Sequence, residues 1–149
     1  MTFSHNKRDG EQPVVARRWF LSMAGISALI GTFVRPSSVL AAEKITQPNP
    51  PSDHAFIARA FEMRRLSSEY GDQPYGAVVV LNGRIVGQSW SRVVLDHDPT
   101  GHAEMSAIRD AARHLKGGDL GSAILYSSSH PCAMCEAAAA WTGIAEMIY

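Results

Sequence analysis

The segment 77–87 has the sequence AVVVLNGRIVG, in which two apolar runs flank Asn82 and Gly83. Asparagine and glycine accept the positive φ angles that both central residues of a type I′ turn require. Apolar, β-branched runs on both sides of such a turn predict two antiparallel strands, 77–81 and 84–87, that form a hairpin. A sheet is therefore expected at the centre of the fold.

Helical patterns lie on both sides of the hairpin. Before it, Ser52 and Asp53 are favourable N-cap residues, and apolar residues then recur at helical spacing as far as Tyr70. After it, residues 102–116 carry an apolar stripe opposite charged side chains, and the pattern ends at Gly117. The sequence therefore predicts one helix before the hairpin and one after it.

The last part of the chain continues this alternation. Its patterns predict a strand at 123–126, a short alanine-rich helix at 131–141 with Pro131 at the first helical position, and a strand at 146–149. Helices that alternate with strands in this way predict an α/β fold. We expect a three-layer α/β/α sandwich around a mixed central sheet.

The first part of the chain has a different composition. Arg17 and Arg18 precede an aromatic-leucine pair, an apolar stretch at 23–34 and small residues before Ala42. This order resembles a twin-arginine export signal. The apolar stretch is shorter than the roughly 20 residues of a membrane-spanning helix. We therefore expect 1–42 to be a cleaved signal, and the mature protein to be exported to the periplasm without membrane contact.

Residues 43–51 contain three prolines and predict a linker, so that a single domain is expected at 52–149. The first 42 residues hold five basic and two acidic side chains, a formal charge of +3, which leaves nine basic and twelve acidic side chains, or −3, in the remainder. A net negative domain has no overall attraction for a phosphate backbone. Nucleic acid is therefore not an expected partner.

Cys132 and Cys135 are the two cysteines of the chain, too few for a disulfide framework. Their spacing is typical of a redox pair or a metal site, and the start of a helix favours the thiolate form that a metal requires. With His102 they make three zinc ligands, the number that a catalytic site uses. A closed structural site would need a fourth protein ligand. The candidates for that ligand are His97, His114 and His130.

Two short motifs contain these residues. His102-Ala103-Glu104 and Pro131-Cys132-Ala133-Met134-Cys135 match the H-x-E and P-C-x-x-C signature of zinc nucleobase deaminases. Together with 73–77, 98–101 and 147–149, they resemble the cytidine deaminase-like superfamily, in the branch of guanine deaminases and tRNA adenosine deaminases. The resemblance covers nearly all of the expected domain.

The resemblance implies a function and its residues. Zinc would be held by His102, Cys132 and Cys135, and Glu104 would carry protons. The implied reaction is the hydrolytic deamination of a free nucleobase or nucleoside, with guanine as the first expectation, by a homodimer. A tRNA adenosine deaminase-like enzyme and a non-catalytic, zinc-stabilised interaction module are the alternatives.

The resemblance also implies substrate contacts. Ser91 stands where the family usually has an asparagine that binds the target base, and Ala103 and Trp141 are further candidates. His130 stands where the family commonly has glutamate. Family members continue past the last predicted strand with another strand and one or two helices, so we expect a chain that is C-terminally shortened relative to the family.

Overall fold

The computed structural model describes residues 44–149, and the predicted export signal at 1–42 lies outside them. The described helices and strands follow the predicted order. They are α1 (Asp53–Glu69), β1 (Gly76–Leu81), β2 (Arg84–Trp90), α2 (Ala103–His114), β3 (Ile124–Ser127), α3 (Ala133–Trp141) and β4 (Glu146–Ile148). Within this part of the chain, no helix combines the length and the apolar character that crossing a bilayer requires.

The hairpin forms as predicted. β1 and β2 pair antiparallel, and the φ angles of Asn82 (52°) and Gly83 (72°) place both turn residues in the left-handed region. β2 continues to Trp90, three residues beyond the predicted end, because its last residues still pair with the start of β1. The register shifts between Val79 and Val80, so the hairpin contains a bulge.

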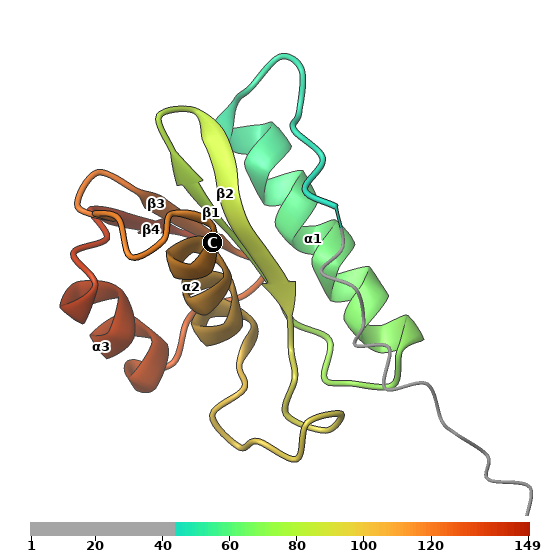
Figure 1. Ribbon diagram of the computed structural model, residues 1–149. Helices are drawn as coiled ribbons and strands as arrows, with labels where there is room; N and C mark the ends of the chain where they lie inside the picture. Colours follow the sequence, from blue (N-terminus) through green and yellow to red (C-terminus); the bar gives the residue numbers. More distant parts are fainter. Residues whose placement is uncertain (1–43) are drawn as a thin grey trace, which may run out of the picture. The chain divides into compact units, whose positions relative to one another are not determined.

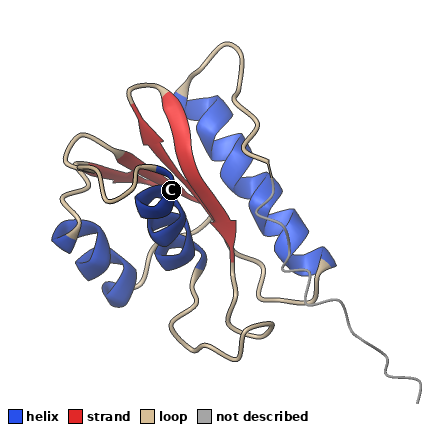
Figure 2. Ribbon diagram, in the orientation of Figure 1, coloured by secondary structure: helices blue, strands red, loops and turns tan. Residues whose placement is uncertain are grey.

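The sheet is mixed, as predicted. Its strand order is β2-β1-β3-β4, with β1 antiparallel to both β2 and β3, and β3 parallel to β4. α1 covers one face of the sheet, whereas α2 and α3 lie on the other (Figures 1 and 2). The three-layer α/β/α arrangement is therefore confirmed.

The core has one apolar cluster on each face of the sheet. Successive side chains of a strand point to opposite faces. Val78 accordingly packs with Phe56 and Met63 in the cluster on the α1 side, whereas Ala77 and Val79 belong to the cluster on the α2 side.

Two glycines allow the helices to approach the sheet closely. A Cβ atom on Gly76 would lie 2.3 Å from the backbone oxygen of Ala60 in α1. On the other face, a Cβ atom on Gly87 would lie 2.4 Å from the backbone nitrogen of Ala111 in α2. Both α1 and α2 are therefore in close backbone contact with the hairpin.

The segment assigned to a linker contacts the domain. The side-chain amide of Gln47 donates to the carbonyl oxygen of Ile85 at 2.8 Å, and its oxygen accepts from the Ile85 amide at 2.9 Å. Ile45 packs against the α1-side cluster. Because β2 is an edge strand, Gln47 occupies backbone groups that would otherwise be open to another strand.

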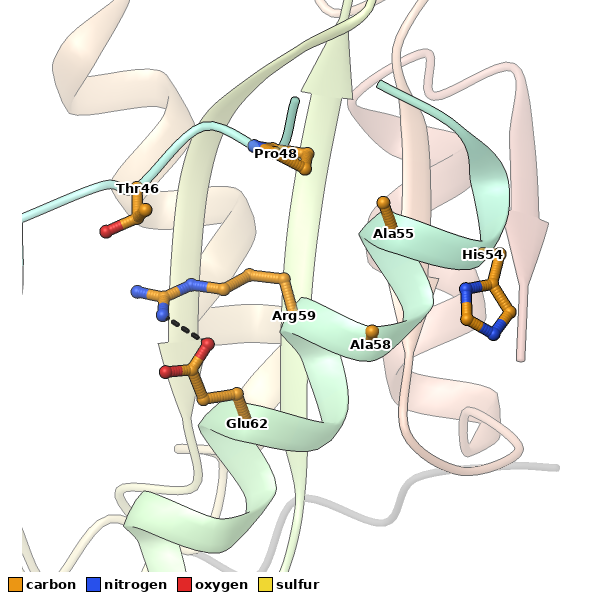
Figure 3. Close-up of a pocket in the computed structure, with 7 residues that line it drawn as sticks. All are labelled: Thr46, Pro48, His54, Ala55, Ala58, Arg59 and Glu62. Atoms are coloured by element: carbon orange, nitrogen blue, oxygen red, sulfur yellow. Dashed lines mark hydrogen bonds and ion pairs between the residues drawn. The ribbon is translucent and has the colours of Figure 1, made fainter. Parts of the chain in front are cut away.

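This segment and α1 also border a hollow of about 390 Å³ (Figure 3). Arg59 lies in it and forms an ion pair with Glu62 at 2.6 Å. The residues that line the hollow are Thr46, Pro48, His54, Ala55, Ala58, Arg59 and Glu62. The hollow therefore lies on the α1 face of the sheet, away from the starts of α2 and α3.

Candidate metal centre

The three predicted ligands come together at the starts of two helices. His102 is the N-cap residue of α2, and Cys132 is the N-cap residue of α3, with Cys135 one turn further on. The prediction that Pro131 is the first helical residue is wrong, because Cys132 is still extended (φ −81°, ψ 165°) and the helix begins at Ala133. Pro131 therefore lies outside the helix, and both cysteines lie at its first turn.

The distances between the ligand atoms fit a tetrahedral zinc site. The two sulfur atoms are 3.7 Å apart, and His102 Nδ1 is 3.5 Å from Cys132 Sγ and 3.7 Å from Cys135 Sγ. With Zn–S bonds of about 2.3 Å and Zn–N bonds of about 2.0 Å, a tetrahedron has S–S edges of about 3.8 Å and S–N edges of about 3.5 Å. The residues present therefore fit zinc without rearrangement.

The predicted alternatives for a fourth ligand do not join this group. Among the described residues, His102, Cys132 and Cys135 form the one group of potential ligands close enough together to hold a metal. His130 Nδ1 lies 2.7 Å from the carbonyl oxygen of its neighbour Pro131. The three-ligand arrangement leaves one position for water or substrate, as catalytic zinc sites do.

The chemistry of Cys135 differs from the expectation. The pKa of the Cys135 thiol is raised well above its usual range. Burial is the largest cause, and the neighbouring charge of Glu104 is the next. The expected stabilisation of the thiolate by the start of a helix is therefore outweighed at this residue. A metal that binds here must displace the proton of Cys135.

Glu104 lies beside the ligands without belonging to their group. Its side chain is 4% exposed, and its Oε2 atom is 3.5 Å from Cys135 Sγ. Its other oxygen, Oε1, accepts a hydrogen bond from Ser127 Oγ at 2.9 Å. Sequence reasoning did not select Ser127, although a polar residue directly after the apolar run of β3 was a visible signal.

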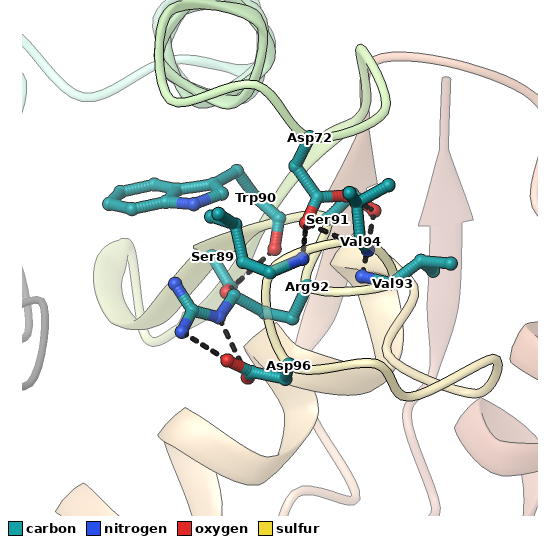
Figure 4. A network of polar contacts seen from close by, with 9 residues as sticks. Asp72, Ser89, Trp90, Ser91, Arg92, Val93, Val94 and Asp96 are labelled. Atoms are coloured by element: carbon teal, nitrogen blue, oxygen red, sulfur yellow. Dashed lines mark hydrogen bonds and ion pairs between the residues drawn. The ribbon is translucent and has the colours of Figure 1, made fainter.

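The three predicted substrate contacts have different surroundings. Ser91 follows β2, is fully buried, and donates its hydroxyl to Asp72 Oδ1 at 2.7 Å (Figure 4). Ala103 is a fully buried residue between a ligand and Glu104. Trp141 is 92% exposed at the last residue of α3, about 9 Å along the helix axis from Cys135. Their roles towards a substrate remain predictions.

The family of the chain follows from comparison with known proteins. Residues 50–149 match the family model of the cytidine and deoxycytidylate deaminase zinc-binding region, and the chain therefore belongs to this family. The zinc-binding character of the family agrees with the geometry of His102, Cys132 and Cys135, so the predicted cofactor is confirmed.

The relatives of the chain include two kinds of deaminase. The tRNA-specific adenosine deaminase of Buchnera aphidicola subsp. Baizongia pistaciae is 37% identical over 98 residues, or 66% of this chain and 60% of the relative. The guanine deaminase of Bacillus subtilis is 44% identical over 68 residues, or 46% of this chain and 44% of the relative.

Comparison with solved structures also identifies a deaminase. The solved structure of guanine deaminase from Bacillus subtilis matches with a TM-score of 0.63 and 35% identity, over 66% of this chain and 63% of that one. The chain thus spans less than two thirds of the length of these relatives. Together, the matches place it in the deaminase family.

Proposed function

We propose that the protein catalyses the zinc-dependent hydrolytic deamination of a free nucleobase or nucleoside, and that guanine is the first substrate to test. The observation that supports this most directly is the Glu104 carboxylate beside a three-ligand site, 3.5 Å from Cys135 Sγ. Zinc held by His102, Cys132 and Cys135 would act as a Lewis acid and would lower the pKa of a bound water to about 7.

Glu104 supplies the proton transfers of this reaction. Its Oε2 atom faces the ligands, so it accepts a proton from the attacking water while the water oxygen forms a bond to the amino-bearing carbon. The same carboxyl passes that proton to the ring nitrogen. It then moves the remaining hydroxyl proton to the amino group, the carbon–nitrogen bond breaks, and ammonia leaves.

Charge and similarity support a small substrate. The chain after residue 42 has a formal charge of −3, which disfavours a large phosphate backbone. The identity with a guanine deaminase, 44% over its matched residues, makes guanine the first choice. Ammonia release from tRNA, but from no free base or nucleoside, would instead support the tRNA adenosine deaminase alternative.

The proposal is tested with matched variants of the purified protein. Cys132→Ala should lose zinc, whereas Glu104→Ala should keep zinc and lose turnover by about 10²–10⁴-fold, the range of general acid–base groups. Zinc content and ammonia release from a panel of bases, nucleosides and tRNA measure both effects. Full turnover in the Glu104→Ala variant would refute the mechanism, and zinc-loaded protein without any turnover would favour a non-catalytic module.

We also propose that the protein is a homodimer. α3 exposes an apolar stripe that begins at the metal site and ends at Trp141, which is 92% exposed; its other members are Ala133, Ala137 and Ala140. An exposed apolar stripe of this kind is typical of a protein interface. Sedimentation of the zinc-loaded protein across a concentration series should show dimers, and Trp141→Lys should shift them to monomers. A monomer at all concentrations would contradict the proposal.

A further inference from the structure

Ser127 is the last residue of β3, and its side chain contacts the Glu104 carboxylate. It is 1% exposed, and its Oγ atom is 2.9 Å from Glu104 Oε1. An ionised carboxylate only accepts hydrogen bonds, so the Ser127 hydroxyl is the donor. The backbone amide of Ser129 approaches the same Oγ atom at 3.5 Å, and it occupies the acceptor side of the hydroxyl. The Ser127 proton is therefore directed at Glu104.

This contact makes the two oxygens of Glu104 different. Oε1 is held by Ser127, whereas Oε2 is 3.5 Å from Cys135 Sγ and faces the ligands. The terminal torsion of a glutamate side chain is broad and roughly two-fold, so nothing within the side chain itself selects this orientation. Two hydrogen bonds set it, from Ser127 to Oε1 and from the Cys135 thiol to Oε2, and only the bond from Ser127 persists when a metal displaces the thiol proton.

The contact persists through the proton transfer. When Oε2 takes a proton, Oε1 becomes the carbonyl oxygen of a carboxylic acid, which still accepts a hydrogen bond. Ser127 thus occupies one oxygen in both protonation states and leaves the other for the proton. Neither the H-x-E nor the P-C-x-x-C motif contains this residue.

We propose that Ser127 is a positioning residue that anchors Glu104 Oε1, so that Oε2 carries the proton. The proposal rests on the proposed deaminase function for its kinetic consequence, but not for the contact itself. A misplaced catalytic group loses much of its effect. Loss of the Ser127 hydrogen bond would leave the Glu104 carboxylate free to rotate, and should therefore lower kcat by about 10–100-fold. Substrate binding and zinc content should not change, because the Ser127 hydroxyl donates to Glu104 and not to one of the three ligands.

The kinetic test compares three variants of the zinc-loaded protein. Ser127→Ala should lower kcat with KM and zinc content unchanged, and Ser127→Thr, which keeps the hydroxyl, should restore most of kcat. Ser128→Ala is the matched control, because Ser128 is also buried at the end of β3 but accepts from the Gly76 amide at 3.0 Å. Unchanged kcat in Ser127→Ala, an equal fall in both alanine variants, or loss of zinc would overturn the proposal.

A second measurement is independent of activity. If the hydrogen bond exists, Ser127→Ala should lower the thermal unfolding midpoint of the zinc-loaded protein more when Glu104 is present than in a Glu104→Ala background. Equal shifts in the two backgrounds would show that the two side chains do not interact, and would overturn the proposal. If the protein deaminates nothing in the panel, the proposed function fails, and this double-variant cycle still decides whether Ser127 anchors Glu104.

Discussion

Asp72 ties the end of α1 to the loop that leads from β2 towards His102 (Figure 4). Its carboxylate accepts hydrogen bonds from four groups, the amides of Gln73, Val94 and Leu95 and the hydroxyl of Ser91. Burial by itself raises the pKa of Asp72, but these hydrogen bonds outweigh burial, and the pKa lies below its usual value. The charged form of Asp72 therefore stabilises the fold.

We expect Asp72→Asn to lower the free energy of unfolding by about 2 kcal/mol, the scale of hydrogen bonds to a charged group. Because the folded-state pKa of Asp72 is lowered, its contribution is fully present above the unfolded-state value near 4 and is lost as the pH falls through the folded-state value. Denaturation at a series of pH values should show a smaller acid-dependent loss in the variant than in the wild type. Equal acid dependence in Asp72→Asn and in the wild type would contradict the assignment.

At the scale of elements, the edge strand β2 is covered by side chains from the segment before α1 and from α2. Gln47 bonds both backbone groups of Ile85, and Asp110 of α2 accepts from the Gln88 amide at 3.1 Å. Open edges of sheets pair readily with other chains, so these side chains both stabilise β2 and limit association.

Gln47→Ala should lower the free energy of unfolding by about 1 kcal/mol and increase aggregation, because it uncovers the Ile85 amide and carbonyl. Gln47→Glu keeps the acceptor for the Ile85 amide but loses the donor to the Ile85 carbonyl. Its free energy of unfolding should therefore also be lower than that of the wild type. Chemical denaturation and light scattering measure the two effects. The neighbouring exposed residue Thr46 provides the control, and equal behaviour of Thr46→Ala and Gln47→Ala would contradict this role.

The elements that sequence reasoning predicted are those with local signals. The hairpin follows from Asn82-Gly83, and the zinc ligands follow from two short motifs at helix starts. The features that it missed depend on pairs distant in the chain. Gln47 and Ile85 are 38 residues apart, and Ser127 and Glu104 are 23 apart. No periodicity or turn preference encodes such contacts, because they form only when the layers pack.

At the scale of the whole molecule, the two parts of the chain have opposite charge. Residues 1–42 have a formal charge of +3 and the remainder has −3. We propose that 1–42 is an export signal and that the mature protein is periplasmic, because a segment with net positive charge and an apolar stretch precedes an acidic domain. Residues 1–42 lie outside the described residues, so the proposal depends on their sequence alone.

The paired arginines are the part of this segment that can be tested without changing its charge. If a twin-arginine receptor reads the signal, the double change Arg17→Lys and Arg18→Lys should block export and leave the precursor unprocessed in the cytoplasm, because the receptor recognises the guanidinium pair and not total charge. Arg8→Lys is the matched control, since it makes the same chemical change outside the pair and should leave export intact. Cell fractionation and the mass of the processed chain measure the outcome. Normal processing of the double variant would show that the chain does not use the twin-arginine route.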